Sequence, residues 1–107
     1  MKIPVVAFDV DGTLIGQTVE DGDHPLYENI QLFLLLQRAG CEMVIWSGGG
    51  SDYASHWADK LGLKAETMAK GECRPDIAFD DEEVKLGKVN IRLARKDVIE
   101  TIMGEIE

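Results

Sequence analysis

Three short apolar segments, each followed at once by polar side chains, constrain the fold of this chain more than any other feature. The segments read VVAF, MVIW and IAF, and they are followed by Asp9, by Ser47 and by the pair Asp80-Asp81. Apolar runs of this length are typical of strands that are buried on both faces of a parallel sheet. Segments long enough for helices separate them, which predicts an α/β protein with a mostly parallel central sheet and helices on both faces.

The pattern along the chain predicts the remaining elements. Strands are expected at 3–8, 42–46 and 77–79, with weaker ones at 63–67 and 89–93, and helices at 25–39, from 51 or 52 to 61, and at 96–106. Pro25 suits a first helical turn and Gly40 suits a helix end. The turn-forming residues of 14–24 predict a loop. Since no linker or repeat interrupts the 107 residues, they predict a single domain, 1–107.

The polar residues that follow the apolar segments are expected to meet. Parallel strands end at one edge of the sheet, about 4.8 Å apart, and open α/β sheets bind ligands at that edge. Asp9, Ser47 and Asp80 or Asp81 would then converge, with Asp11 close behind. Two like charges 4 Å apart repel by about 4 kcal/mol at an effective dielectric constant near 20. Such a cluster needs a cation, and an all-oxygen site favours Mg²⁺, which shares its ligands with a substrate phosphate.

The segment Ser47-Gly48-Gly49-Gly50 adds an anion pocket beside this cation. A hydroxyl group and unhindered backbone N–H groups that lead into a helix are typical of phosphate-binding loops. A carboxylate at such a site can attack phosphorus and form an acyl phosphate that water hydrolyses. A second carboxylate two residues on can protonate the leaving oxygen and later activate the water. The cation, the carboxylates and the anion pocket together predict a phosphate site.

The acidic composition disfavours negatively charged binding partners. The net charge is -9 and the acidic residues are spread along the chain, which opposes broad binding to a nucleic-acid backbone or an anionic membrane but not to a cation. No stretch approaches the roughly 18 apolar residues of a membrane span, and the N-terminus turns acidic before a signal sequence can develop. Cys41 and Cys73 lie outside any CxxC pattern and are expected to be reduced thiols. We therefore expect a cytoplasmic protein.

Three motifs, FDVDGT at 8–13, IWSGG at 45–49 and AFDDE at 78–82, resemble those of the haloacid dehalogenase (HAD) superfamily. The resemblance covers most of the chain and implies a three-layer, Rossmann-like fold with Mg²⁺-dependent phosphotransfer. Only 14–24 separates the first motif from the next predicted helix, so a folded cap domain does not fit. The chain is similar to small, capless, phosphatase-like members, including those of the bacteriophage type. Such relatives act on small phosphoesters or on a phosphate that a macromolecule presents.

The resemblance also implies roles for the matched residues. Asp9 would be the nucleophile and a metal ligand, and Asp11 the general acid/base, with its backbone carbonyl a further metal ligand. Asp81 would bind the metal directly, with Asp80 as a metal-site residue beside it. Substrate contacts would come from the small and hydroxyl residues of the first two motifs, namely Gly12, Thr13, Ser47, Gly48 and Gly49.

The family's remaining catalytic element is a lysine that neutralises the nucleophile and the phosphate. Lys70 is the candidate because it lies shortly before the strand that ends at Asp80, and the spacing leaves Arg74 and Lys64 open as rivals. A guanidinium group would not be a neutral replacement for an ammonium group. Two other functions stay open. One is a non-catalytic or regulatory binding domain, and the other is a phosphatase for polynucleotide ends, which the acidic balance disfavours.

Overall fold

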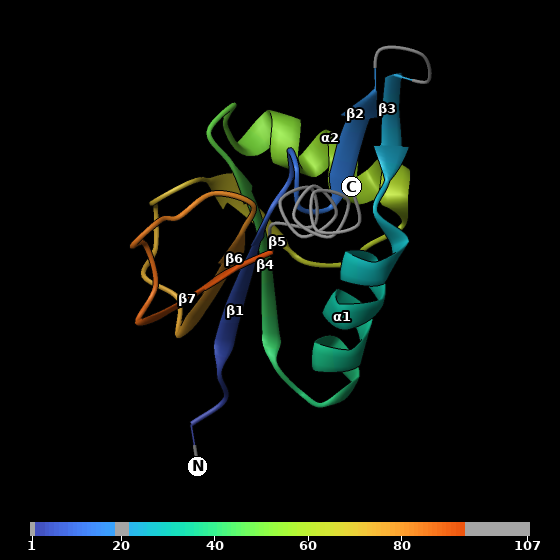
Figure 1. Cartoon of the computed structure of the whole chain (residues 1–107). Coiled ribbons are helices and arrows are strands. Elements are labelled where there is room, and N and C mark those ends of the chain that lie inside the picture. Colours follow the sequence, from blue (N-terminus) through green and yellow to red (C-terminus); the bar gives the residue numbers. More distant parts are fainter. Residues whose placement is uncertain (1, 19–21, 94–107) are drawn as a thin grey trace, which may run out of the picture.

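The computed structural model describes residues 2–18 and 22–93, and it centres on a five-stranded sheet. Each neighbouring pair of strands is parallel, and the spatial order is β5-β4-β1-β6-β7 (Figure 1). The strands are β1 (Val5–Asp9), β4 (Glu42–Ser47), β5 (Glu66–Ala69), β6 (Ile77–Asp80) and β7 (Val89–Arg92). The α/β class and the parallel central sheet predicted from the apolar segments are thus confirmed.

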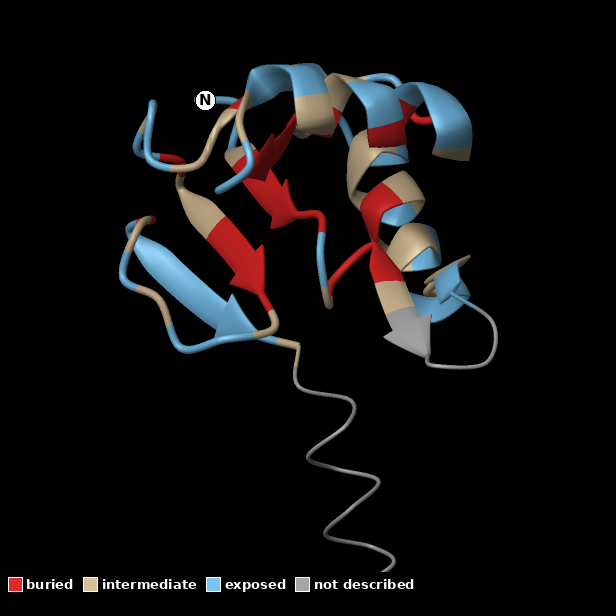
Figure 2. Ribbon diagram, turned by 90° about the horizontal axis from the view of Figure 1, so that it is seen from above, coloured by how far each residue is buried: buried red, intermediate tan, exposed pale blue. Residues whose placement is uncertain are grey.

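The strand that carries the first motif occupies the middle of the sheet. β1 pairs with β4 on one side and β6 on the other, with Phe8 opposite both Ile45 and Phe79. Four of its five residues are buried, whereas β7 at the sheet edge is exposed along its whole length (Figure 2). The three strands with polar ends are therefore immediate neighbours, as the sequence predicts.

Large apolar side chains fill one face of the sheet. Phe8 of β1 packs against Phe79 with ring centroids 4.6 Å apart, and against Phe33 at 5.3 Å in an edge-to-face arrangement. Phe33 belongs to α1 (Tyr27–Arg38), and the same cluster includes Trp57 of α2 (Ser51–Leu61). Both helices therefore cover the same face (Figure 1).

The opposite face is built from smaller side chains and is covered by connecting loops. Its buried cluster contains Ala7, Val44, Trp46, Met68 and Ala78, and it packs against Cys73 and Leu86. Those two residues lie in 70–76 and 81–88, which are too short for the dozen-residue helical crossovers that usually join parallel strands. Within the described residues this face has no helix, contrary to the expected helices on both faces. The helix predicted at 96–106 lies outside the described residues, so the three-layer arrangement stays a prediction.

The segment between β1 and α1 differs from the predicted loop. It forms an antiparallel hairpin of β2 (Ile15–Thr18) and β3 (Gly22–Pro25), with Ile15 opposite Pro25. Pro25 therefore ends a strand, and α1 begins at Tyr27, because the Leu26 N–H donates to Leu14 O at 2.9 Å and continues the pairing. The helix ends as predicted, with Gly40 at φ +99° immediately after its C-cap.

The weak strand expected at 63–67 lies further along the chain. α2 ends at Leu61, its C-cap Gly62 adopts a left-handed conformation at φ +70°, and Leu63 turns into the core. The strand β5 starts only at Glu66, where the chain reaches the edge of β4. Within the described residues, no helix is both long and apolar enough to cross a membrane.

Candidate functional site

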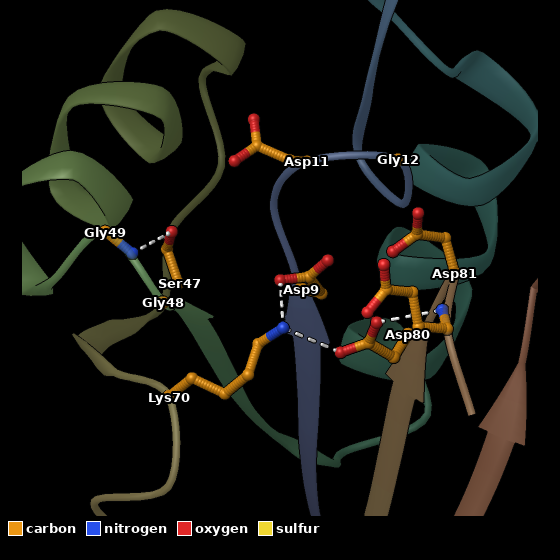
Figure 3. Close-up of a pocket in the computed structure, with 10 residues that line it drawn as sticks. Asp9, Asp11, Gly12, Ser47, Gly48, Gly49, Lys70, Asp80 and Asp81 are labelled. Atoms are coloured by element: carbon orange, nitrogen blue, oxygen red, sulfur yellow. Dashed lines mark hydrogen bonds and ion pairs between the residues drawn. The ribbon is translucent and has the colours of Figure 1, made fainter. Parts of the chain in front are cut away.

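A polar pocket of about 530 Å³ lies at the carboxyl edge of the sheet (Figure 3). The loops that leave β1, β4, β5 and β6 all contribute to it. Its lining consists of Asp9, Asp11, Gly12, Ser47, Gly48, Gly49, Lys70, Asp80, Asp81 and Glu82. The structure therefore brings the predicted site residues together, with the exception of Thr13.

Two aspartates at the ends of the central strands share one lysine. Asp9 and Asp80 close β1 and β6 and are only 4% and 2% exposed, because hydrophobic packing surrounds the strands up to their last residue. The Lys70 Nζ lies 2.8 Å from Asp9 Oδ1 and 2.9 Å from Asp80 Oδ2. Lys70 follows β5, and its backbone N–H donates to Ser47 O at 2.9 Å. The Lys70 ammonium group is thus held in place by two ion pairs and by the hydrogen bond of its own backbone.

Asp80 has both carboxylate oxygens engaged. Its Oδ1 accepts from the Glu82 N–H at 3.0 Å while its Oδ2 accepts from Lys70. This arrangement suits a residue that orients the lysine. The rivals for the lysine, Arg74 and Lys64, are exposed and do not line the pocket.

Three carboxylates form a group that could hold a metal ion. Asp9, Asp80 and Asp81 each offer an oxygen, and these oxygens lie within 4.8 Å of one another. Asp81 sits so close to the backbone at Gly12 that a Cβ there would overlap its carboxylate, and Gly12 also has φ +81°. A small all-oxygen donor set of this kind fits Mg²⁺, which keeps several of its waters.

The crowding of these carboxylates changes their protonation. Burial, reinforced by the charges of Asp80 and Asp81, raises the pKa of Asp9 to about 7, although Lys70 acts to lower it. Burial and the neighbouring Asp80 also raise the pKa of Asp81. Partial burial acts to lower the pKa of Lys70, yet its bonds to Asp9 and Asp80 give a net increase. The lysine therefore stays charged, and a divalent cation would relieve the remaining repulsion among the carboxylates.

The serine-glycine turn lies on the other side of the pocket. Ser47 is 2% exposed, and its Oγ accepts from the Gly49 N–H at 3.0 Å. The Gly50 N–H donates to Ser47 O at 3.1 Å, so two of the backbone donors predicted for an anion are engaged within the turn. The Ser47 hydroxyl proton can still be donated to a ligand, because its oxygen acts only as an acceptor in this contact.

Asp11 and Thr13 occupy positions that the sequence did not reveal. The Asp11 carboxylate points away from the three-carboxylate group (Figure 3) and accepts a 2.7 Å hydrogen bond from the Tyr53 hydroxyl. This bond raises the pKa of Tyr53. Thr13 is fully buried outside the pocket lining, where its carbonyl accepts from Asn29 Nδ2 at 2.8 Å. Tyr53, in the first turn of α2, was not among the predicted site residues.

No protein-family model, curated protein or solved structure matches the chain. Membership of the HAD superfamily therefore stays a prediction from the three motifs. What the site can do follows from its own contacts and charges.

Proposed function

We propose that the protein is a Mg²⁺-dependent phosphatase that hydrolyses a phosphomonoester through an aspartyl phosphate on Asp9. The observation that carries the proposal is the position of the Lys70 ammonium between Asp9 and Asp80, with Asp81 close to both. A structural ion pair needs one carboxylate, whereas this lysine is surrounded by more negative charge than it neutralises. Such an arrangement is suited to a second cation, and the two cations together can then hold an anionic phosphoryl group.

The residues divide the reaction between them. An Asp9 oxygen attacks phosphorus and forms the acyl phosphate, while Lys70 and the Ser47 hydroxyl stabilise charge on the transferring phosphoryl oxygens. Asp9 and Asp81, supported by Asp80, would hold Mg²⁺, which supplies further charge neutralisation at the phosphoryl oxygens. Asp11 protonates the leaving oxygen and then removes a proton from the water that attacks the acyl phosphate. That step releases inorganic phosphate and restores the Asp9 carboxylate.

The lining of the pocket favours a loosely held substrate. Among the residues that line it, none has an apolar or aromatic side chain that could pack against a leaving group. Specific small-molecule sites are usually lined by such side chains. The proposed substrate class is therefore a small phosphomonoester or a phosphate exposed on a larger molecule.

The test measures hydrolysis of p-nitrophenyl phosphate with and without Mg²⁺. We expect turnover by the wild type to require Mg²⁺, and Asp9→Asn to reduce it by about a thousandfold or more, because the nucleophile is lost. Asp76→Asn makes the same chemical change at an aspartate outside the pocket, and it should keep wild-type turnover.

The outcomes separate the alternatives. Turnover that Asp9→Asn leaves unchanged would reject the aspartyl-phosphate mechanism. A wild type that hydrolyses no member of a broad phosphoester panel, but binds Mg²⁺, would favour the non-catalytic binding domain.

A further inference from the structure

Tyr53 connects the serine-glycine turn to the loop that follows the neighbouring strand β1. It lies in the first turn of α2, and its hydroxyl donates to Asp11 Oδ1 at 2.7 Å. Its ring lies over the serine-glycine turn so closely that a Cβ at Gly49 would come within 3.3 Å of it. A tyrosine that only packed against the turn would not need to place its hydroxyl on a carboxylate from the loop after β1.

The contact with Tyr53 determines where the Asp11 carboxylate lies. The three-carboxylate group consists of Asp9, Asp80 and Asp81, and Asp11 does not belong to it. In Figure 3 the Asp11 side chain points away from Asp9 and from Lys70. Without a partner, this exposed side chain could rotate freely, since only one hydrogen bond to it is found among the described residues.

The bond also makes the two Asp11 oxygens unequal. Oδ1 accepts the tyrosine O–H, which leaves Oδ2 as the oxygen free to exchange a proton with a ligand. When Asp11 gives up that proton, its new negative charge is stabilised by the Tyr53 O–H, because hydrogen bonds to an ionised acceptor are stronger than neutral ones.

We propose that Tyr53 is a positioning residue for the proton transfer by Asp11, an inference that rests on the proposed phosphatase function. Tyr53 holds the carboxyl group on the α2 side of the pocket and leaves Oδ2 as the oxygen that meets the leaving group. As the bond between phosphorus and the leaving oxygen breaks, the Oδ2 proton moves to that oxygen and an alcohol departs. The Asp11 carboxylate, still bonded to Tyr53, later takes one proton from the attacking water.

The experiment compares two leaving groups. p-Nitrophenolate departs without protonation, whereas an alkoxide requires a proton from the enzyme. We expect Tyr53→Phe to lower kcat/KM for an alkyl phosphate such as glycerol phosphate by about tenfold or more, the usual effect of a lost hydrogen bond to a charged group. For p-nitrophenyl phosphate the loss should stay within about threefold. In the Asp11→Asn background, Tyr53→Phe should produce no further loss on either substrate.

Controls separate positioning from a structural effect. Tyr53→Phe keeps the ring over Gly49, so its thermal midpoint should match that of the wild type. Tyr27→Phe makes the same change at an exposed tyrosine on α1 and should alter neither substrate.

Equal losses on the two substrates, or no loss on the alkyl phosphate, would overturn the inference while leaving the phosphatase proposal intact. Absence of any turnover by the wild type would reject both. The same would follow if turnover were unaffected by Asp9→Asn.

Discussion

An aspartate precedes the strand β6 and another ends it, and the surroundings of the two differ in almost every respect. At the amino end, Asp76 Oδ2 accepts from the Val5 N–H at 2.8 Å, and its Oδ1 pairs at 3.2 Å with Lys88, whose side chain is 55% exposed. These contacts lower the pKa of Asp76. At the carboxyl end, Asp80 is buried beside Asp9, whose pKa is raised to about 7.

The difference between the two ends distinguishes an ion pair that supports the fold from one that supports a site. Asp76 is one negative charge with one cation and a backbone donor, in contact with solvent. Around Lys70, a single cation serves two buried carboxylates with a third close by. Buried like charges weaken a fold unless something neutralises them. The carboxyl end of β6 is therefore the end expected to bind ligands, and the amino end is expected to be structural.

Removal of the site lysine gives the largest expected effect. Lys70→Met should reduce phosphatase turnover by about a hundredfold or more, because the charge on the phosphoryl oxygens loses its fixed cation. The same variant should lose about 2 kcal/mol of stability, less than for a fully buried pair since Lys70 is partly exposed. Enzyme kinetics and urea unfolding measure the two effects.

Lys88→Met is the matched control at the other end of β6. It should keep full turnover and cause only a small loss of stability, because its partner Asp76 retains the Val5 N–H. If Lys88→Met impaired turnover as much as Lys70→Met, the contrast between the two ends would be wrong.

The second prediction concerns the metal. In the wild type, Mg²⁺ at a hundredfold excess over its Kd should stabilise the fold by about 2.7 kcal/mol. Asp81→Asn should remove most of that gain and should raise the thermal midpoint of the metal-free protein, because one of the crowded charges is gone. Thermal unfolding with EDTA and with Mg²⁺ measures both changes.

Glu83→Gln provides the control, since it makes the same carboxylate-to-amide change at an exposed residue two positions along the chain. It should retain the Mg²⁺ response. A full Mg²⁺ response in Asp81→Asn would exclude Asp81 as a ligand.

The smallest expected effect is at the amino end. Asp76→Asn should lower the thermal midpoint by a few degrees at neutral pH, because it weakens the bond to the Val5 N–H and removes the pair with Lys88. The folded pKa of Asp76 lies below the unfolded value of about 3.9. Its stabilisation is thus present above that unfolded value and is lost as pH falls through the folded pKa.

Unfolding curves of the wild type and Asp76→Asn, recorded from pH 7 down to pH 2, provide the measurement. The two should differ at neutral pH and converge at the acidic end. Curves that stay apart at the acidic end would show that the Asp76 charge is not the source of its stabilisation.

Part of this contrast could be predicted from the sequence. Apolar segments that end in Asp9, Ser47 and Asp80 identified three neighbouring strands, because parallel strands place their ends at one edge. Lys70 reaches the pocket because it directly follows β5. The strand predicted in this region began three residues too early, so the prediction did not place Lys70. Sequence spacing alone therefore left Arg74 and Lys64 as alternatives.

Other features depend on tertiary contacts that leave no local pattern. Apart from the buried Ile15, the strands β2 and β3 contain turn-forming and polar residues, so no alternating apolar pattern indicates their pairing. The contact between Tyr53 and Asp11 joins residues 42 positions apart, one in the first turn of α2 and the other on the loop after β1. Neither residue type nor spacing distinguishes that tyrosine from one that packs in the core.

The bridge made by Lys70 has a consequence during protein synthesis. One of its partners, Asp9, is synthesised well before the other, Asp80, because β1 precedes β6 in the chain. A nascent polypeptide that stops before β6 exposes one flank of β1 and lacks one of the two anchors of the ammonium group. Any chemistry at this edge is therefore withheld from unfinished or truncated products, and proteolytic removal of β6 would abolish it at once.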